Sequence, residues 1–124
     1  MSEIRSYRDL KAWRKGMDLA TRIYEATRAF PKEERYGLSQ QLQRACVSVP
    51  ANIAEGWGRS DRKDYVRFLR IARGSLFEAQ THLLLAGRLG YLTGARLDEP
   101  MELSDECSRV LHGLIKSLMR KDKT

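Results

Sequence analysis

Apolar residues recur at alternating intervals of three and four positions along most of the chain, which is the pattern of amphipathic helices. No segment shows a convincing alternation of apolar and polar residues, the pattern typical of a strand. Helix-ending residues separate the periodic segments, with Pro31 after the first and Gly90 and Gly94 after the third. The pattern therefore predicts four helices, covering roughly residues 8–29, 34–59, 61–90 and 96–121 of the 124-residue chain.

Each predicted helix carries one apolar stripe that repeats about every 3.5 residues. Such stripes on helices joined by short turns predict an all-α fold, a left-handed antiparallel up-down four-helix bundle, with residues 1–124 in a single domain. The predicted core positions are Leu10, Trp13, Met17, Ala20, Tyr24 and Thr27 in the first helix, Leu38, Leu42, Ala45, Val49, Asn52 and Gly56 in the second, Tyr65, Leu69, Ala72, Leu76, Ala79, Leu83 and Ala86 in the third, and Leu97, Met101, Ser104, Ser108, Leu111, Ile115 and Leu118 in the fourth.

The second predicted helix is also apolar on the side turned away from its core stripe. Between Ala45 and Gly58 it holds a single charged residue, Glu55, whereas an exposed helix face normally carries Lys and Glu. We expect a second copy of the chain to cover this side, because contiguous exposed apolar surface marks interaction sites. The alternative is cover by the tail or loops of the same chain. The predicted contact residues are Val47, Pro50, Ala54 and Trp57.

Pro50 lies in the middle of this predicted helix. A proline there removes a backbone hydrogen bond and clashes with the carbonyl four residues back, that of Cys46. We expect a bend at this point, with packing gained from it. A break that exposes Asn52 or Glu55 for catalysis is the alternative.

The chain is basic, with 23 Lys and Arg residues against 16 Asp and Glu residues and a formal net charge of +7. Such a charge favours nucleic acid, anionic lipid or acidic proteins as partners. A candidate RNA or DNA contact surface lies on the outer side of the third helix, formed by Lys63, Arg67, Arg70, Arg73 and Arg88.

The alternative is an ordinary solvated face, or one paired with acids such as Asp98, Glu99 and Glu102. The sequence lacks a zinc motif, a helix-turn-helix signature and an aromatic-rich platform for single strands, so we expect no sequence-specific recognition of bases.

Polar residues share one sector of the second helix and one sector of the third. If the two sectors face each other, they form a buried polar network that fixes the register of the helices; an active site is the alternative. The predicted network comprises Arg44, Ser48, Asn52, Glu55 and Arg59 on the second helix, and Ser75 and Glu78, with His82 beside them, on the third.

The residues that most often perform catalysis are sparse. Cys46 and Cys107 are far apart and are predicted to be buried apolar groups rather than a disulfide or a reactive thiol. The Glu-x-x-His pairs of di-iron bundles are missing before His82 and His112. Phosphate-binding glycine loops and nucleophile elbows are also missing.

We therefore expect a non-enzymatic protein without cofactor, metal or small-molecule substrate. A hydrolase would instead require an open polar pocket around Glu55 and Glu78. No run approaches the roughly 20 apolar residues of a membrane span, and the start MSEIRSYRDL lacks the apolar core of a secretory signal. These features predict a cytoplasmic protein with no membrane partner.

Several motifs resemble those of a known family. The most specific are PANIAEG, at Pro50–Gly56, followed by Arg59, and ARGSL, at Ala72–Leu76, followed by Glu78. With YRDLKAW before them and LIKSL near the end, they resemble the 23S rRNA intervening-sequence proteins, a family of small bacterial four-helix bundles. Residues 93–105 fit this pattern least well, which leaves the start of the fourth helix around Pro100 in doubt.

The resemblance implies a left-handed up-down bundle that forms a homo-oligomer, a pentameric ring in family members. It also implies a link to RNA or DNA, because some members are encoded within sequences that interrupt rRNA genes, and a related bundle is the accessory protein of diversity-generating retroelements, where it partners a reverse transcriptase. No enzymatic activity is established for the family. We therefore expect a non-enzymatic homo-oligomeric scaffold associated with RNA or DNA. The alternative is a protein-binding adaptor with no nucleic-acid role.

Overall fold

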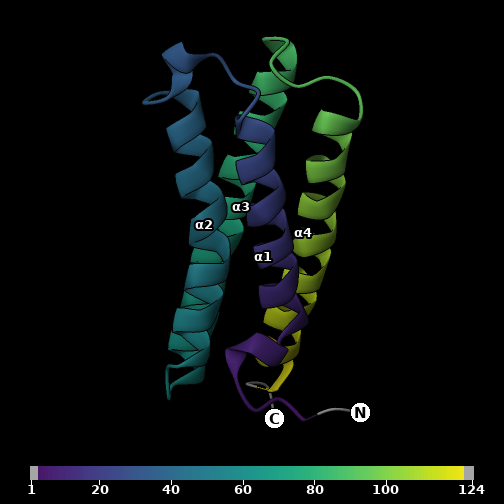
Figure 1. Cartoon of the computed structure of the whole chain (residues 1–124). Coiled ribbons are helices and arrows are strands. Elements are labelled where there is room, and N and C mark those ends of the chain that lie inside the picture. Colours follow the sequence, from purple (N-terminus) through teal and green to yellow (C-terminus); the bar gives the residue numbers. More distant parts are fainter. Residues whose placement is uncertain (1–2, 122–124) are drawn as a thin grey trace.

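The computed structural model describes residues 3–121 and contains four long helices (Figure 1). The all-α fold class is confirmed, and residues 3–121 contain no strand. The long helices are α1 (Lys11–Thr27), α2 (Leu38–Trp57), α3 (Arg62–Arg88) and α4 (Ala95–Lys121), and two short 3-10 helices, η1 (Tyr7–Asp9) and η2 (Lys32–Glu34), precede α1 and α2.

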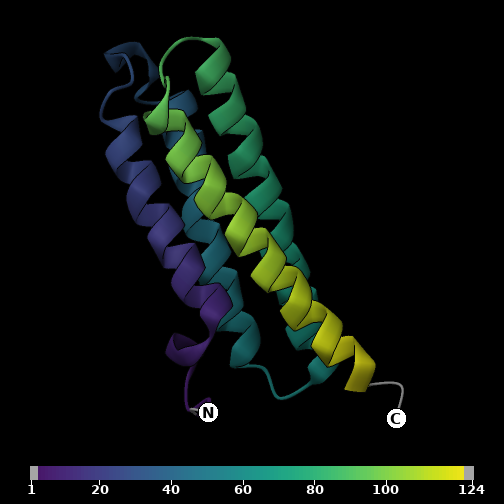
Figure 2. The ribbon, with the colours of Figure 1, turned by 90° about the vertical axis from the view of Figure 1, so that its right-hand side faces the viewer.

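The four helices form a bundle in which consecutive helices run in opposite directions (Figures 1 and 2). Helix α1 packs against α2 and α4, and helix α3 packs against the same two neighbours. The α1–α2 and α3–α4 connections lie at one end of the bundle, and the α2–α3 connection lies at the other. Helices α1 and α3 therefore occupy opposite corners. The left-handed sense of packing stays a prediction.

The start of α2 differs from the predicted boundary at residue 34. Residues Lys32–Glu34 form the separate helix η2, and α2 begins at Leu38. The Glu34 carboxylate accepts a hydrogen bond from the backbone N–H of Leu38 at 3.1 Å and another from the Tyr91 hydroxyl at 2.8 Å. Glu34 thereby satisfies a free N–H at the start of α2 and joins it to the α3–α4 connection.

Different local features define the starts of α3 and α4. Asp61 is the N-cap of α3 and accepts a hydrogen bond from the Lys63 backbone N–H at 3.2 Å. Gly90 and Gly94 have φ values of 79° and 56°, which favour glycine and permit the turn between α3 and α4. Helix α4 begins at Ala95 and continues through the buried Pro100.

The core stripe of α3 agrees with the prediction from Leu69 to Ala86, whereas that of α1 does not. Met17 and Tyr24, predicted to be buried, are 42% and 45% exposed. The buried face of α1 instead combines four small or short residues with two large ones, Leu19 and Ile23, and the small residues let neighbouring helices approach. It consists of Ala12, Gly16, Leu19, Ala20, Ile23 and Thr27.

Pro50 lies inside the bundle, so its predicted role in a contact between copies is wrong. Helix α2 runs without interruption through Pro50, whose ring is buried against α1. A Cβ atom added at Gly16 would lie only 3.4 Å from the Pro50 N, Cβ and Cδ atoms. The absence of a side chain at Gly16 therefore lets the proline ring pack directly against the α1 backbone.

Helices α2 and α3 form the most extensive helix interface of the bundle. The two helices approach each other closely at Gly56, where an added Cβ would lie 2.8 Å from the Phe68 Cβ. Within the described residues, none of the helices is both long and apolar enough to traverse a lipid bilayer.

Candidate nucleic-acid interface

The first turns of α3 present most of the predicted basic surface to solvent. Lys63, Arg67 and Arg70 are exposed, and Arg73 is half-buried. Arg67 forms a salt bridge of 2.9 Å with Asp64, which lies one turn before it. One acid therefore neutralises part of this surface.

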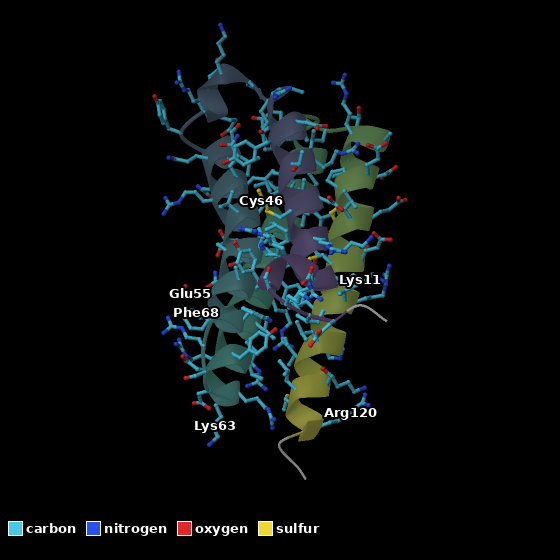
Figure 3. All side chains as sticks on the ribbon, turned by 60° about the horizontal axis from the view of Figure 1, so that its bottom comes forward. Lys11, Cys46, Glu55, Lys63, Phe68 and Arg120 are labelled. Carbon is cyan, nitrogen blue, oxygen red and sulfur yellow. The ribbon has the colours of Figure 1, made fainter. Side chains whose placement is uncertain are left out.

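The last turns of α4 extend the same surface. The Arg70 guanidinium donates a hydrogen bond to the Met119 Sδ atom at 3.2 Å, which places the end of α4 beside the start of α3. Lys116 and Arg120 are exposed there, and the labelled Lys63 and Arg120 side chains lie at the same end of the bundle in Figure 3. We call this surface the α3–α4 basic end: Lys63, Arg67, Arg70, Arg73, Lys116 and Arg120.

Sequence reasoning missed the contribution of α4. In an antiparallel bundle, the end of the fourth helix lies beside the start of the third, so the bases in both segments could have been combined. Lys116 and Arg120 lie near the end of α4, and most acids of α4 lie before them. The helix as a whole therefore has mixed charge, although its end is basic.

The acids of α4 do not neutralise the basic end. Within residues 3–121, Arg67 is the one member of the α3–α4 basic end that forms a salt bridge. Glu99, considered above as a partner, pairs instead with Arg22 on α1. Five of the six cations thus have no acidic partner in the described chain.

Arg88 does not join this cluster. It lies 18 residues after Arg70 in α3, which corresponds to about 27 Å along the helix axis at 1.5 Å per residue. A single nucleic-acid contact at the basic end would therefore not include it.

The Phe68 ring contacts two arginines, one of which, Arg67, belongs to the α3–α4 basic end. The guanidinium carbons of Arg59 and Arg67 lie 4.7 Å and 4.5 Å from the centroid of its ring. Arg59 also pairs with Glu55 at 3.1 Å and with Asp64 at 3.7 Å. These contacts join the end of α2 to the start of α3 and hold both arginines in place.

The predicted polar network consists of separate groups rather than one connected set. The hydroxyl oxygens of Ser48 and Ser75 lie 2.9 Å apart across α2 and α3. The Asn52 amide donates to the Ser48 carbonyl and hydroxyl at 2.8 Å and 2.9 Å. This half-buried group links the two helices and is separate from the Glu55–Arg59 pair.

Most charged members of the predicted network face solvent, so its description as buried is wrong. The side chains of Glu55 and Arg59 are 56% and 44% exposed. The Glu78 carboxylate lies 3.3 Å from the His82 ring and is also largely exposed, and Arg44 is exposed without a salt bridge in the described chain. Exposed ion pairs of this kind contribute about 0–1 kcal/mol. The helical pattern predicts on which side of a helix a residue lies. It does not predict how deeply neighbouring helices bury that side.

An open groove of about 430 Å³ runs between the polar sides of α2 and α3. Its lining includes Arg44, Ser48, Ser75 and Glu78, but not Asn52 or Glu55. The two serines bond to each other, and no base or nucleophile pair is assembled. The two carboxylates that a hydrolase would require, Glu55 and Glu78, do not share this groove.

The cysteines are free and fully buried, as predicted for structural residues. Burial raises the pKa of the Cys46 thiol to about 12 and that of the Cys107 thiol to about 11. Both remain protonated near neutral pH and are therefore poor nucleophiles. No group of three potential metal ligands occurs in residues 3–121.

The other predicted contact residues of α2 differ in exposure. Val47 is exposed, Ala54 is half-buried, and Trp57 is half-buried with its side chain packed against the core of its own chain. Sequence reasoning also missed a larger set of exposed apolar residues on α3. These residues are Ile71, Phe77, Leu84, Leu85 and Leu89.

Comparison with known proteins agrees with this architecture. The family model for the 23S rRNA-intervening sequence protein matches residues 8–113. The crystal structure of a protein with unknown function from the S23 ribosomal protein family of Bacteroides thetaiotaomicron is 27% identical, with a TM-score of 0.76. The match covers 85% of this chain and 98% of that chain. No curated protein sequence is significantly similar to the chain.

Proposed function

The chain belongs to the 23S rRNA-intervening sequence protein family, and we propose that it is a non-enzymatic, self-associating scaffold that holds RNA or DNA by the phosphate backbone. The α3–α4 basic end is the contact surface, and the cytoplasm is the expected location.

The proposed binding of RNA or DNA rests on the absence of acidic partners for most cations of the α3–α4 basic end. Lys63, Arg70, Arg73, Lys116 and Arg120 lie on two adjacent helices without a salt bridge in the described chain. Lys and Arg side chains in such a cluster replace the counterions of several phosphates, and release of those ions supplies sequence-independent affinity. The surface offers no set of base-reading groups inserted into a groove, so it favours the backbone over the bases.

The size of the cluster sets the expected dependence on salt. If all five bases each neutralised one phosphate, the slope of log K against log salt would be about −4.5 for duplex DNA and about −3.5 for a single strand. Fewer contacts would give a proportionally shallower slope. Assembly of several copies multiplies the basic ends and strengthens the attachment of a long strand.

Binding should be measured by fluorescence anisotropy with labelled random-sequence RNA and duplex DNA over a range of salt concentrations. We expect wild-type affinity to fall steeply with salt. The variant Arg70→Glu/Lys116→Glu should lose most of this affinity and reduce the slope by about 2, because each phosphate contact contributes about 1.

The matched control is Arg28→Glu/Arg96→Glu, which has the same change in net charge but lies at the other end of the bundle, where both residues are exposed. It should retain more affinity and the wild-type slope. Equal losses in the two double variants would contradict a localised contact. No salt-dependent binding by the wild type would contradict the nucleic-acid function and favour the adaptor.

The self-association part of the proposal is supported by exposed apolar side chains on α2 and α3 and by the resemblance to pentameric members of the family. Val47 and Leu84 are 44% and 51% exposed. Sedimentation equilibrium of the wild-type chain should give several times the 14.3 kDa mass of one chain. A single-chain mass at all concentrations would contradict self-association without affecting the binding test above.

A further inference from the structure

We propose that a cavity between the end of α1 and the start of α2 binds a phosphate monoester, which is held by the Ser39 hydroxyl and by backbone N–H groups of the first turn of α2. We call it the α2 cavity. Its volume of about 600 Å³ is typical of small-molecule sites. The cavity is lined by Thr27, Phe30, Pro31, Lys32, Arg35, Ser39 and Gln43.

Ser39 is a buried polar residue whose side chain lacks a partner. It is only 8% exposed, and its hydroxyl forms no hydrogen bond within residues 3–121. In that part of the chain, no buried side-chain oxygen is both closed to solvent and unpaired, so the hydroxyl opens into the cavity that Ser39 lines. Because buried hydroxyls normally have partners, this one is available to a ligand.

The other polar side chains on this side of the cavity already bond to each other. Gln43 lies one turn after Ser39 on the same side of α2, and its amide donates a hydrogen bond to the Thr27 hydroxyl at 2.9 Å. That hydroxyl donates in turn to the Tyr24 carbonyl at 3.0 Å. These bonds hold the end of α1 against α2, and they leave the Ser39 hydroxyl as the unused donor.

The start of α2 adds two backbone donors. Its N-cap, Gly37, has no side chain that could accept from the following N–H groups. The Leu38 N–H bonds to Glu34 at 3.1 Å, whereas the N–H groups of Ser39 and Gln40 have no acceptor in the described chain. Free N–H groups are usual at a helix start. Here they accompany an unpaired buried hydroxyl, and together with the helix dipole they favour an anion.

The charged side chains of the cavity also favour an anion. Lys32 and Arg35 are exposed at its edge and form no salt bridge within residues 3–121. The acids of η2, Glu33 and Glu34, do not belong to the lining. Glu34 accepts a hydrogen bond from the Tyr91 hydroxyl at 2.8 Å instead. An anion that enters the cavity therefore meets two cations and no carboxylate of the lining.

The donors select a phosphate monoester among the common anions. Such a group has three acceptor oxygens and about two negative charges, which suit a hydroxyl, two N–H groups and two cations better than the single charge of a carboxylate does. Because Ser39 is recessed, a terminal phosphate reaches it more easily than a phosphodiester, which carries substituents on both sides. Phe30 and Pro31 provide an apolar wall for the organic part of the ligand.

The α2 cavity and the α3–α4 basic end lie at opposite ends of the bundle. The α1–α2 connection is at one end, and the start of α3 is at the other (Figures 1 and 2). Binding of a phosphate monoester in the cavity therefore does not require the proposed contact with RNA or DNA. Each site can be removed while the other stays intact.

An NMR titration with sodium phosphate, at an ionic strength kept constant with sodium chloride, tests the cavity. The backbone N–H resonances of Ser39 and Gln40 should shift and saturate, because both groups gain an acceptor. Ala12 is the matched control, since it lies at the start of α1, which also lacks a side-chain cap; its resonance should not saturate. Adenosine 5′-monophosphate should reproduce the shifts, and adenosine should not.

Ser39→Ala should weaken phosphate binding by about tenfold or more, because it removes a hydrogen bond to a charged group. Ser60→Ala, at an exposed serine between α2 and α3, should bind phosphate as the wild type does. Lys32→Gln changes an exposed side chain and should also weaken binding, so it keeps the test valid if Ser39→Ala misfolds. Circular dichroism checks the helicity of each variant.

The absence of saturable shifts at Ser39 and Gln40 overturns the site. Equal phosphate affinity of Ser39→Ala and the wild type, or an equal saturable shift at Ala12, also overturns it. The variant Arg70→Glu/Lys116→Glu should retain phosphate binding, which separates this site from the contact with RNA or DNA.

RNA with a 5′-phosphate and the same RNA with a 5′-hydroxyl distinguish the source of the phosphate. A preference for the phosphorylated RNA that Ser39→Ala abolishes supports the site and assigns it to the end of a nucleic acid. Equal affinity for the two RNAs, with Ser39-dependent binding of adenosine 5′-monophosphate, supports the site and assigns it to a small phosphorylated molecule.

Discussion

The packing of α2 against α3 at Gly56 gives a quantitative prediction for the variant Gly56→Ala. The new Cβ would lie 2.8 Å from the Phe68 Cβ and 3.1 Å from the Tyr65 carbonyl oxygen, whereas ordinary contacts lie at 3.4–4 Å. Neither of these atoms can move away by rotation of a side chain. The two helices must therefore separate by several tenths of an ångström.

The cost of this separation exceeds the benefit of the alanine. Overpacking of a well-packed core costs about 1–3 kcal/mol, and replacement of a helical glycine by alanine contributes about 0.5–1 kcal/mol in the opposite direction. We therefore expect Gly56→Ala to lower the free energy of unfolding by about 1 kcal/mol, within a range of about 0–2.5 kcal/mol. For a chain of this length, such a loss lowers Tm by roughly 2–10 °C.

Gly113→Ala is the matched control, because Gly113 is an exposed residue within α4 and an added Cβ there would meet nothing within 4 Å. It should raise the free energy of unfolding by about 0.5–1 kcal/mol. Urea unfolding followed by circular dichroism at two protein concentrations measures both variants and separates folding from assembly. If Gly56→Ala unfolds at or above the wild-type midpoint while Gly113→Ala is stabilised, the reasoning from close packing is refuted.

Two further predictions concern pH and thiol reactivity. Glu34 accepts hydrogen bonds from the Leu38 N–H and the Tyr91 hydroxyl, and these lower the pKa of its carboxyl in the folded chain, the Leu38 bond having the larger effect. The contribution of Glu34 to stability is therefore complete above the unfolded pKa of 4.5. It is lost as the pH falls through the folded pKa. The stability difference between wild type and Glu34→Gln should shrink between pH 7 and pH 3 in urea titrations, and an equal difference at both pH values would contradict this. Cys46 and Cys107 should react with a thiol reagent at pH 8 only as fast as the protein opens, because both are buried with raised pKa values, so immediate reaction of the folded chain would contradict their placement.

The sequence predicted the four helices and the stripe of α3 because those features depend on local periodicity. Leu69, Leu76 and Leu83 recur at intervals of seven and are all buried, and Gly90, with its positive φ, follows the end of the helix. The boundaries depended on single hydrogen bonds that periodicity does not record. The hydrogen bond from the Leu38 N–H to the Glu34 carboxylate accompanies a start of α2 four residues after the predicted one, whereas α3, with Asp61 as its N-cap, starts within one residue of the prediction.

The candidate surfaces were harder to predict because they combine helices. Arg70 was identified as a contact residue from the sequence of α3 alone. Its neighbour Lys116 was not, because it belongs to a helix that contains both acidic and basic residues. The polar residues of α2 and α3 were placed on facing sides correctly at Ser48 and Ser75. The extent to which these side chains are buried could not be predicted from the sequence of either helix. It depends on how far the neighbouring helices extend over them.

The mispredicted core of α1 adjoins exposed apolar surface of the kind that supports self-association. Spacing at intervals of three and four predicted that Met17 and Tyr24 fill the core, yet the buried face includes Gly16 instead and leaves both of them exposed. Because Gly16 admits the Pro50 ring against the α1 backbone, α1 and α2 lie close together at this level, and the neighbouring Met17 is exposed. A close contact inside one chain is thus accompanied by exposed apolar surface on the outside. If that surface serves assembly, a larger residue at Gly16 should weaken the fold and the oligomer together, whereas Val47→Glu should weaken the oligomer alone.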